Sequence, residues 1–299
     1  MIKKPTFPIY YNIKKRKEKE MFSILINFLQ KKHIDLCAAV PLSSCTVTKP
    51  YLLAREGISD GSVFIFAIPY FTPSCLRDDR NVSTYAVSKD YHIFFAKLFE
   101  ECIPLLRSAF PNNRFCAFAD HSPIMEVEAA AMGGLGLLGK NGTLITEAYS
   151  SYVFLGEIIT DAAIPTASDF SIAYCEGCGR CLNACPKREI GQCLSALTQQ
   201  KGALTDTEAD ALIKNGIAWG CDICQEVCPH TARAIQNKTI FTPVQFFYDS
   251  PISHLTASQI EDMSREEFTC RAYAWRKKET ILRNLQILEK AKQKGDRLC

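Results

Sequence analysis

Apolar residues recur along the first half of the chain with two different spacings. In residues 21–32 and 83–110 they fall three or four positions apart, which predicts two amphipathic helices, the second of them long. Short apolar runs predict buried strands at 34–41, 62–71, 114–119 and 151–160. Helices that alternate with strands indicate an α/β (α+β) domain.

One loop of this pattern carries a carboxylate. Asp120 follows the predicted strand 114–119 and precedes a helix that Ser122-Pro123 is expected to open, with a capping hydroxyl just before a proline. Sheets of α/β domains place ligands beyond the carboxyl ends of their strands. Because Ser122 is better placed to cap the helix, Asp120 is a candidate functional residue.

The pattern changes near residue 168, where cysteines become frequent and helical segments become short. We therefore expect four parts: a disordered basic tail (1–20), an α/β domain (21–167), a cysteine-rich domain (168–240) and a C-terminal helical segment (241–299). Basic residues of the last part are candidate contacts to nucleic-acid phosphates, with a solvated helix face as the alternative: Arg271, Arg276, Lys277, Lys278 and Arg283.

Composition narrows the class of protein. The 299 residues are 47% apolar and 22% charged, which is ordinary for a globular protein, and the net charge is only +3. An odd number of cysteines, 15, without a secretory signal argues against a disulfide framework and for a reducing compartment. The longest apolar runs, such as 63–71, are about half the length of a membrane span. We expect a cytoplasmic protein with no membrane partner.

Eight cysteines have the spacing of iron–sulfur ligands. The first four follow the C-x2-C-x2-C-x3-C-P pattern, in which the fourth cysteine ligates the other of two clusters: Cys175, Cys178, Cys181 and Cys185. The second group keeps the C-x2-C-x3-C-P remainder, and an insertion displaces its first member: Cys193, Cys221, Cys224 and Cys228.

This spacing predicts two [4Fe–4S] clusters in a ferredoxin-like domain. Crossed ligation assigns Cys228 to the cluster of Cys175, Cys178 and Cys181, and Cys185 to the cluster of Cys193, Cys221 and Cys224. The alternative is zinc, which prefers two separated C-x2-C pairs and fits the two Cys-Pro endings poorly. Because such clusters pass single electrons, we expect the α/β domain to hold whatever is reduced.

A glycine-rich segment, 133–145, is a second candidate site in the α/β domain. Its five glycines allow the backbone to approach a large ligand closely. The spacing of Gly134, Gly139 and Lys140 is that of a phosphate-binding loop, but Asn141 stands where a Ser or Thr should bind magnesium. Gly134, Gly136 and Gly139 also have the G-x-G-x-x-G spacing of a dinucleotide-binding loop. Both kinds of loop follow a strand, whereas 124–132 is predicted to be helical, so both nucleotide interpretations are rejected.

Together these motifs resemble the cobalamin-dependent epoxyqueuosine reductases, iron–sulfur relatives of the reductive dehalogenases. The family's Asp-Ser-Ala-Pro segment, Gly-Leu-Gly-x-x-Gly-Lys loop, Phe-Leu-Gly-Glu strand and Asp-Tyr-His helix are similar to residues 120–123, 134–140, 154–157 and 90–92. "CLSALT" at 193 and "WGCDICQEVCP" at 219 continue the similarity, which runs in order from about residue 22 to about 290.

The resemblance implies a fold and a reaction. A cobalamin-binding α/β domain holds the cofactor base-off, and the ferredoxin-like domain caps it and delivers electrons from an external low-potential donor. The epoxide of epoxyqueuosine at the tRNA wobble position is reduced to queuosine, with Asp120 as the proton donor. The implied cofactor contacts are Lys140, Asn141, Phe154, Leu155, Ser195, Thr198 and His92.

Two departures from the family pattern stand out. Asp-Ser-Ala-Pro has become Asp-His-Ser-Pro, which changes the surroundings of Asp120. Many members continue into a helical-repeat domain that helps to hold tRNA, and this chain ends where that domain would begin, so we expect a short form. Two alternatives stay open: a corrinoid-dependent reductase of another substrate, and a two-cluster electron-transfer protein that serves a corrinoid or flavin partner.

Overall fold

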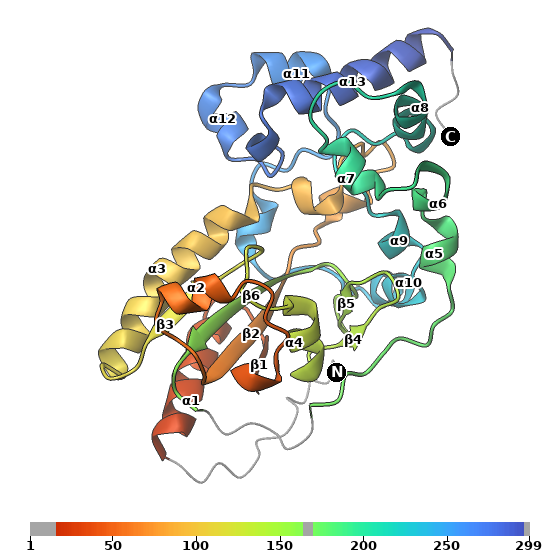
Figure 1. Ribbon diagram of the computed structural model, residues 1–299. Coiled ribbons are helices and arrows are strands. Elements are labelled where there is room, and N and C mark those ends of the chain that lie inside the picture. Colours follow the sequence, from red (N-terminus) through yellow and green to blue (C-terminus); the bar gives the residue numbers. More distant parts are fainter. Residues whose placement is uncertain (1–15, 164–169, 296–299) are drawn as a thin grey trace. The chain divides into compact units, whose positions relative to one another are not determined.

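The computed structural model describes residues 16–163 and 170–295, and the chain divides into two compact units (Figure 1). The first unit comprises the described residues up to Pro69 together with Phe95–Gly177. The second comprises Tyr70–Phe94 and the described residues from Cys178 onward. Among the described residues, no helix is both long and apolar enough to cross a membrane.

A four-stranded sheet forms the centre of the first unit. Its strands lie in the order β1 (Leu36–Pro41), β2 (Ser62–Pro69), β6 (Val153–Thr160) and β3 (Phe115–Phe118). Every neighbouring pair is antiparallel. The strands predicted from the sequence are all present, but antiparallel pairing makes this an α+β arrangement rather than one with a parallel sheet.

Helices cover both faces of this sheet, which explains why β2 is buried along its whole length. On one face, Phe64 stacks on Phe22 of α1 (Arg16–Gln30) with ring centroids 5.7 Å apart. Phe66 packs on the same face against Phe95 of α3 (Tyr91–Ala109), at 6.2 Å. Because side chains alternate along a strand, Ile65 faces the other side, where the alanines of α4 (Glu126–Met132) complete a buried cluster.

Two helices begin at other residues than the sequence predicted. Helix α1 starts at Arg16, so residues 16–20 of the predicted tail are helical, and the rest of that tail lies outside the described residues. Helix α3 starts only at Tyr91, because the preceding segment bonds elsewhere: the Ser83 amide donates to the carbonyl of Trp219, 2.6 Å away. The prediction of one helix over 83–110 is therefore wrong in its first eight residues.

The helix expected to open at Ser122-Pro123 also begins later. Helix α4 starts at Glu126, and its capping position is Met125, whose side chain makes no cap bond. The carbonyl of Pro123 instead accepts from the amides of Thr48 and Lys49, at 2.8 and 3.1 Å. This pairing keeps the segment out of the helix, and the Ser122 hydroxyl accepts from the Ile124 amide at 3.0 Å, so Ser122 is not the cap of α4 that the sequence suggested.

The remaining elements of the first unit are short. They are the 3-10 turn Leu42–Ser44, helix α2 (Pro50–Arg55) and the two-stranded ribbon of β4 (Leu137–Leu138) and β5 (Leu144–Ile145). The ribbon lies within the glycine-rich segment 133–145 and pairs Leu137 with Ile145.

Short helices make up most of the second unit. Six lie in and around the cysteine-rich segment: α5 (Arg180–Ala184), α6 (Lys187–Ile190), α7 (Leu194–Thr198), α8 (Asp206–Asn215), α9 (Ile223–Glu226) and α10 (Pro229–Gln236). The described part of the helical segment expected at 241–299 contains three α-helices: α11 (Ala257–Asp262), α12 (Arg265–Thr269) and α13 (Lys278–Gln293).

Segment 70–94 packs in the second unit, although the sequence placed it in the α/β domain. Its Asn81 side chain donates to the carbonyl of Leu255 and accepts from the Leu255 amide, both at 2.8 Å. The backbone carbonyl of Asn81 also accepts from Ala218, at 2.6 Å. These bonds join residues more than 130 positions apart, which no local sequence pattern reveals. The four-part division of the chain stays a prediction.

Candidate functional site

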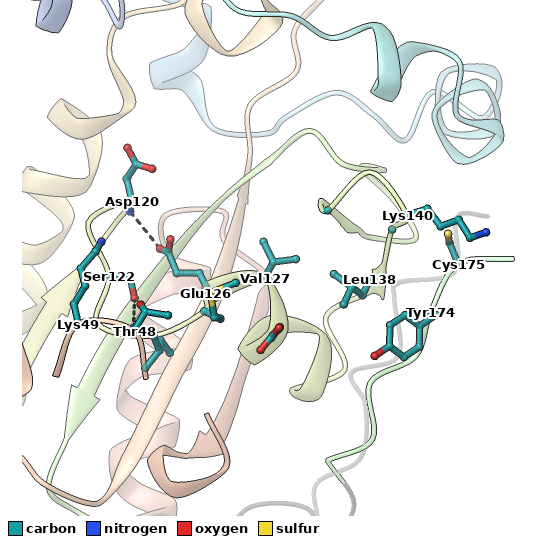
Figure 2. Close-up of a pocket in the computed structure, with 15 residues that line it drawn as sticks. Thr48, Lys49, Asp120, Ser122, Glu126, Val127, Leu138, Lys140, Tyr174 and Cys175 are labelled. Atoms are coloured by element: carbon teal, nitrogen blue, oxygen red, sulfur yellow. Dashed lines mark hydrogen bonds between the residues drawn. The ribbon is translucent and has the colours of Figure 1, made fainter. Parts of the chain in front are cut away.

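A cavity of about 850 Å³ lies in the first unit beside α4 (Figure 2). Its wall is formed by the residues before α2, the loop between β3 and α4, helix α4, the turn after β4, and the chain just before Gly177. The lining residues are Thr48, Lys49, Asp120, Ser122, Ile124, Met125, Glu126, Val127, Glu128, Leu138, Gly139, Lys140, Gly142, Tyr174 and Cys175. Two sequence candidates, Asp120 and Lys140, and one predicted cluster ligand, Cys175, therefore line one cavity, with Asp120 apart from the other two (Figure 2).

Asp120 occupies the loop after β3 with an unusual backbone. Its φ of +68° lies in the left-handed region, which costs a residue with a Cβ roughly 1–2 kcal/mol. The Asp120 amide donates to Oε1 of Glu126, 3.2 Å away (Figure 2). Because the sheet is antiparallel, its carboxyl strand ends do not share one edge, and the argument that singled out Asp120 from the strand end does not hold. Its place in the cavity wall supports the candidate instead.

His121, which departs from the family pattern, contacts two side chains from the chain around α2. Its Nδ1 lies 3.4 Å from Nζ of Lys49, and its Nε2 lies 3.2 Å from the hydroxyl of Tyr51. Both contacts are exposed to solvent. The imidazole thus links the loop that carries Asp120 to a neighbouring element.

A buried carboxyl pair lies behind this loop. Glu157 on β6 is fully buried, and Glu126 on α4 is half-buried. Burial raises the pKa of Glu157 well above its usual range, and the charge of Glu126 raises it further, while the Ser122 hydroxyl acts in the opposite direction. Burial is also the main cause of the raised pKa of Glu126. Burial and the nearness of a second carboxyl therefore both favour the protonated form of one of the two acids.

The glycine-rich segment forms a tight ribbon whose turn borders the cavity. A Cβ on Gly136 would lie 2.4 Å from the carbonyl oxygen of Ile145, so only glycine allows the ribbon to close there. A Cβ on Gly142 would meet nothing within 4 Å, and its φ is +80°. Asn141 holds the turn by accepting from the Thr143 hydroxyl at 2.9 Å, and it is not among the lining residues. Lys140 is exposed.

The two implied cofactor contacts on β6 leave the sheet in opposite directions. Leu155 packs against the α4 side, on the same face as Glu157. Phe154 must face the α3 side, where the neighbouring Gly156 would bring a Cβ within 2.3 Å of the Phe95 ring. A single face of this strand therefore does not present both side chains.

In the second unit, three of the predicted cluster ligands are neighbours. Burial, together with the smaller effects of nearby Asp222, Cys224 and Cys193, raises the pKa of the Cys221 thiol to about 12. Across residues 16–163 and 170–295, however, no three Cys, His, Asp or Glu side chains have the spacing of a formed metal site. The assignment of ligands to clusters stays a prediction.

A buried acid fixes the backbone between Cys221 and Cys224. The side chain of Asp222 accepts from Arg80 at 2.8 Å, from the Ser83 hydroxyl at 2.5 Å and from the Thr84 amide at 2.6 Å. Arg80 also pairs with the partly exposed Glu226. Segment 70–94 is thus hydrogen-bonded to the loop that carries two predicted ligands, Cys221 and Cys224.

The other implied cofactor contacts also belong to the second unit. His92 stands in the first turn of α3, half exposed, with Nδ1 2.8 Å from Oδ1 of Asp90 and its ring stacked on Tyr91. Thr198 is buried in α7, where its hydroxyl donates to the Ser195 carbonyl and accepts from the Gly220 amide. These bonds give Thr198 a structural role in the described residues.

The cysteine-rich segment matches a family model. That family is described as a 4Fe-4S double cluster binding domain, and the match covers residues 174–231. All eight predicted ligands fall inside it. The match supports iron–sulfur clusters, rather than zinc, as the use of these cysteines.

Relatives extend the similarity beyond that segment. The chain is 32% identical over 238 residues to an epoxyqueuosine reductase of Synechocystis, covering 75% of this chain and 82% of that protein. It is 35% identical over 195 residues to one of Gloeobacter violaceus, covering 62% of this chain and 61% of the relative. The chain belongs to the epoxyqueuosine reductase family. The resemblance seen in the motifs is confirmed.

The fold agrees with this family. A crystal structure of an epoxyqueuosine reductase with an epoxyqueuosine-modified stem loop of tRNA-Tyr superposes with a TM-score of 0.69. The superposition covers 91% of this chain and 81% of that one, at 20% identity. The chain therefore has the mixed helix-and-sheet fold of this family, together with a 4Fe–4S binding domain.

Sequence reasoning missed four residues around Asp120: Lys49, Tyr51, Glu126 and Glu157. One of them left a signal, because Glu157 is a carboxylate in the middle of the apolar strand "VFLGEIIT". A charged residue in such a run is almost never buried without a special reason. The others lie in segments whose closeness to Asp120 depends on tertiary packing alone.

Proposed function

We propose that this member of the family reduces epoxyqueuosine in tRNA to queuosine. The observation that carries the proposal is a shared cavity: Asp120, a candidate acid, and Cys175, a predicted cluster ligand, both line it. A deoxygenation needs a proton source and an electron source on one substrate. This cavity has residues suited to both.

Cobalamin, bound base-off, is the proposed cofactor, and it would supply the low-potential metal centre for the reduction. The cavity fits a large ligand of mixed polarity. Ile124, Val127 and Leu138 give it an apolar wall, Gly142 leaves room for close backbone approach, and Lys140 adds a polar rim. The other contacts implied by the family resemblance are not among the residues that line this cavity: Asn141, Phe154, Leu155, Ser195, Thr198 and His92.

Electrons are proposed to arrive through two [4Fe–4S] clusters with the crossed ligand sets. Eight thiolates with two Cys-Pro endings fit this pair of clusters. The neighbouring thiols of Cys193, Cys221 and Cys224 support one of the two sets. An external low-potential donor would reload the clusters.

Asp120 is proposed to protonate the departing oxygen. Conversion of an epoxide to an alkene releases the oxygen as water and consumes two electrons and two protons. A carboxylic acid beside that oxygen would supply one of the protons directly. General-acid catalysis of this kind raises the rate by about 10²–10⁴-fold.

The test is a turnover assay. Protein reconstituted anaerobically with iron, sulfide and cobalamin would be given a chemical reductant and tRNA that carries epoxyqueuosine, and the nucleosides would then be separated. We expect queuosine to form. Bound cobalamin without conversion would indicate a corrinoid-dependent reductase of another substrate. Protein with two clusters that leaves the cobalamin spectrum unchanged would indicate an electron-transfer protein.

A further inference from the structure

The buried carboxyl of Glu157 has no part in the chemistry proposed above. It lies in the middle of β6, opposite Ile65 of β2 and Phe118 of β3. The residue is 0% exposed, and its carboxyl oxygens have no hydrogen bond of good geometry, although the Ser122 hydroxyl lies close enough to favour the charged form. A carboxylate buried without donors is strongly destabilising, whereas a neutral acid in the same place is tolerated and can itself donate.

The groups around Glu157 come from four neighbouring segments. Glu126 faces it from α4, Ser122 from the β3–α4 loop and Lys49 from the residue before α2. Two thiols complete the titratable surroundings, Cys116 on β3 and Cys45 after the first 3-10 turn. Lys49 carries a positive charge, but it is partly exposed and lies beside His121. The second carboxyl, Glu126, is therefore the partner to which a protonated Glu157 would donate.

Glu126 connects this pair to the cavity. Its Oε1 accepts from the amide of Asp120, at 3.2 Å, and its own carboxyl lines the cavity wall. Asp120 has a left-handed backbone, so the loop needs stabilising contacts to keep this conformation. The bond to Glu126 is one of them, and a donor on the far side of Glu126 would fix its direction.

We propose that Glu157 and Glu126 share one proton and that this pair positions Asp120, with the Glu157 O–H donating to Glu126 and Glu126 accepting from the Asp120 amide. The inference rests on the proposed function in one respect, that Asp120 is the proton donor there. Glu126 and Glu157 act through Asp120 and are positioning residues.

Two substitutions at Glu157 test whether the pair needs a hydrogen-bond donor at this position. Glu157→Gln keeps a neutral hydrogen-bond donor of the same size, and Glu157→Leu removes the donor. Glu147→Gln and Glu147→Leu are matched controls, because Glu147 is an exposed residue of the same unit. All variants would be made in the full chain with reconstituted clusters.

The first readout is amide hydrogen exchange in the peptide that covers 118–124, whose sequence none of these substitutions changes. We expect exchange in Glu157→Leu to be about threefold to tenfold faster, the factor that loss of one hydrogen bond produces, and exchange in Glu157→Gln to match the wild type. The second readout is infrared absorption. We expect the wild type at neutral pH to have a protonated-carboxyl carbonyl band that both Glu157 variants lack and both Glu147 variants keep.

Turnover of epoxyqueuosine tRNA is the third readout, with losses of about tenfold to a hundredfold expected for Glu157→Leu and little loss for Glu157→Gln. Unchanged loop exchange in Glu157→Leu, or an absent infrared band in the wild type, would overturn the proposal. Equal losses in Glu157→Gln and Glu157→Leu would also overturn it, because a neutral donor of the same size would then fail to replace Glu157. The first two readouts need no substrate, so the pair can be confirmed even where tRNA is not turned over, and that outcome would count against the proposed function alone.

Discussion

Asp120 is the residue on which the proposed reaction depends most directly. Its carboxyl belongs to the cavity wall, and its left-handed backbone is a conformation that Asp and Asn adopt more readily than most residues. Asn is therefore a replacement that keeps the loop and removes the acid.

We expect Asp120→Asn to lower turnover by about 10²–10⁴-fold, because a positioned general acid contributes that much. Iron content and the spectrum of bound cobalamin should stay as in the wild type. Asp35→Asn, at an exposed position of the same unit, is the matched control. Turnover within a few-fold of the wild type would show that another group donates the proton, and Tyr91 and His92 would be examined next.

The raised pKa of Glu157 makes stability depend on pH. The unfolded carboxyl titrates near 4.5, and burial together with the charge of Glu126 raises its pKa in the folded protein well above that value. Between these two pKa values the folded state binds more protons than the unfolded state. Stability from this group is therefore present in full below about pH 4.5 and is lost as pH rises toward the folded pKa, with a slope of up to about 1.4 kcal/mol per pH unit.

Glu157→Gln removes this proton. We expect the melting temperature of the variant to rise relative to the wild type as pH increases from 5 to 8, measured by thermal unfolding of full-length protein in matched buffers. Glu147→Gln should follow the wild-type curve. Parallel curves for Glu157→Gln and the wild type would mean that Glu157 has the same proton affinity folded and unfolded.

His121 is the second residue-scale feature of the loop. Its contacts with Lys49 and Tyr51 are exposed, so each contributes little, of the order of 0–1 kcal/mol. We expect His121→Ala to reduce turnover by no more than about tenfold and to leave overall stability within about 1 kcal/mol of the wild type. A loss as large as that of Asp120→Asn would instead give His121 a direct part in proton transfer.

At the scale of elements, segment 70–94 and the loop before α9 depend on each other. Asp222 is 2% exposed and holds Arg80, Ser83 and Thr84, and breaking a buried ion pair by removing one partner costs about 3–5 kcal/mol. Because Asp222 stands between Cys221 and Cys224, the same contacts hold the backbone that carries both thiols. Segment 70–94, which is remote in sequence, thus supports the backbone of a proposed cluster site.

We expect Asp222→Ala to lose iron, with a content falling from about eight toward about four atoms per chain because one of two four-iron clusters is affected. Glu226→Gln is the control, since Glu226 also pairs with Arg80 but its side chain is 46% exposed. Iron analysis and the visible absorption of anaerobically reconstituted protein measure the outcome. Full iron content in Asp222→Ala would show that the cluster forms without this support.

At the scale of the whole molecule, the question is which surface meets tRNA. Of the five basic candidates near the C-terminus, Arg271 is buried and donates to the Ser250 carbonyl, and Arg283 donates to the carbonyls of Gln200 and Gly202. Those two hold the fold. Lys277 is exposed beside Trp275, which is 59% exposed and lies 3.8 Å from the Arg276 guanidinium. An exposed aromatic ring with cations is a surface suited to nucleic acid.

We expect Lys277→Glu to weaken tRNA binding several-fold and to lower the slope of log K against log salt by about 0.7–0.9, the contribution of one phosphate contact. Lys238→Glu is the matched control, because Lys238 is likewise exposed with a positive φ of 57°. Binding would be measured by titration at several salt concentrations. Identical slopes for the wild type and Lys277→Glu would assign Lys277 to a solvated face.

The local sequence determined which segments could be strands and which cysteines could be ligands. Apolar runs such as 62–71 must be buried, and the spacing from Cys175 to Cys185 has few chemical uses. Strands and cluster ligands could therefore be predicted from residues that are close together in the sequence. The family resemblance rested on the same short motifs. Helix starts were less well determined, because at Ser83 and Pro123 long-range hydrogen bonds outweigh local propensity.

Tertiary structure alone decided how these segments combine. The antiparallel order β1-β2-β6-β3, the packing of 70–94 in the second unit, and the meeting of Glu126 with Glu157 all depend on contacts between distant residues. No local pattern encodes such contacts, since their energies come from burial and pairing that exist only after the chain has folded. The sequence by itself therefore determined the candidate chemistry, and the folded chain decided which side chains surround Asp120.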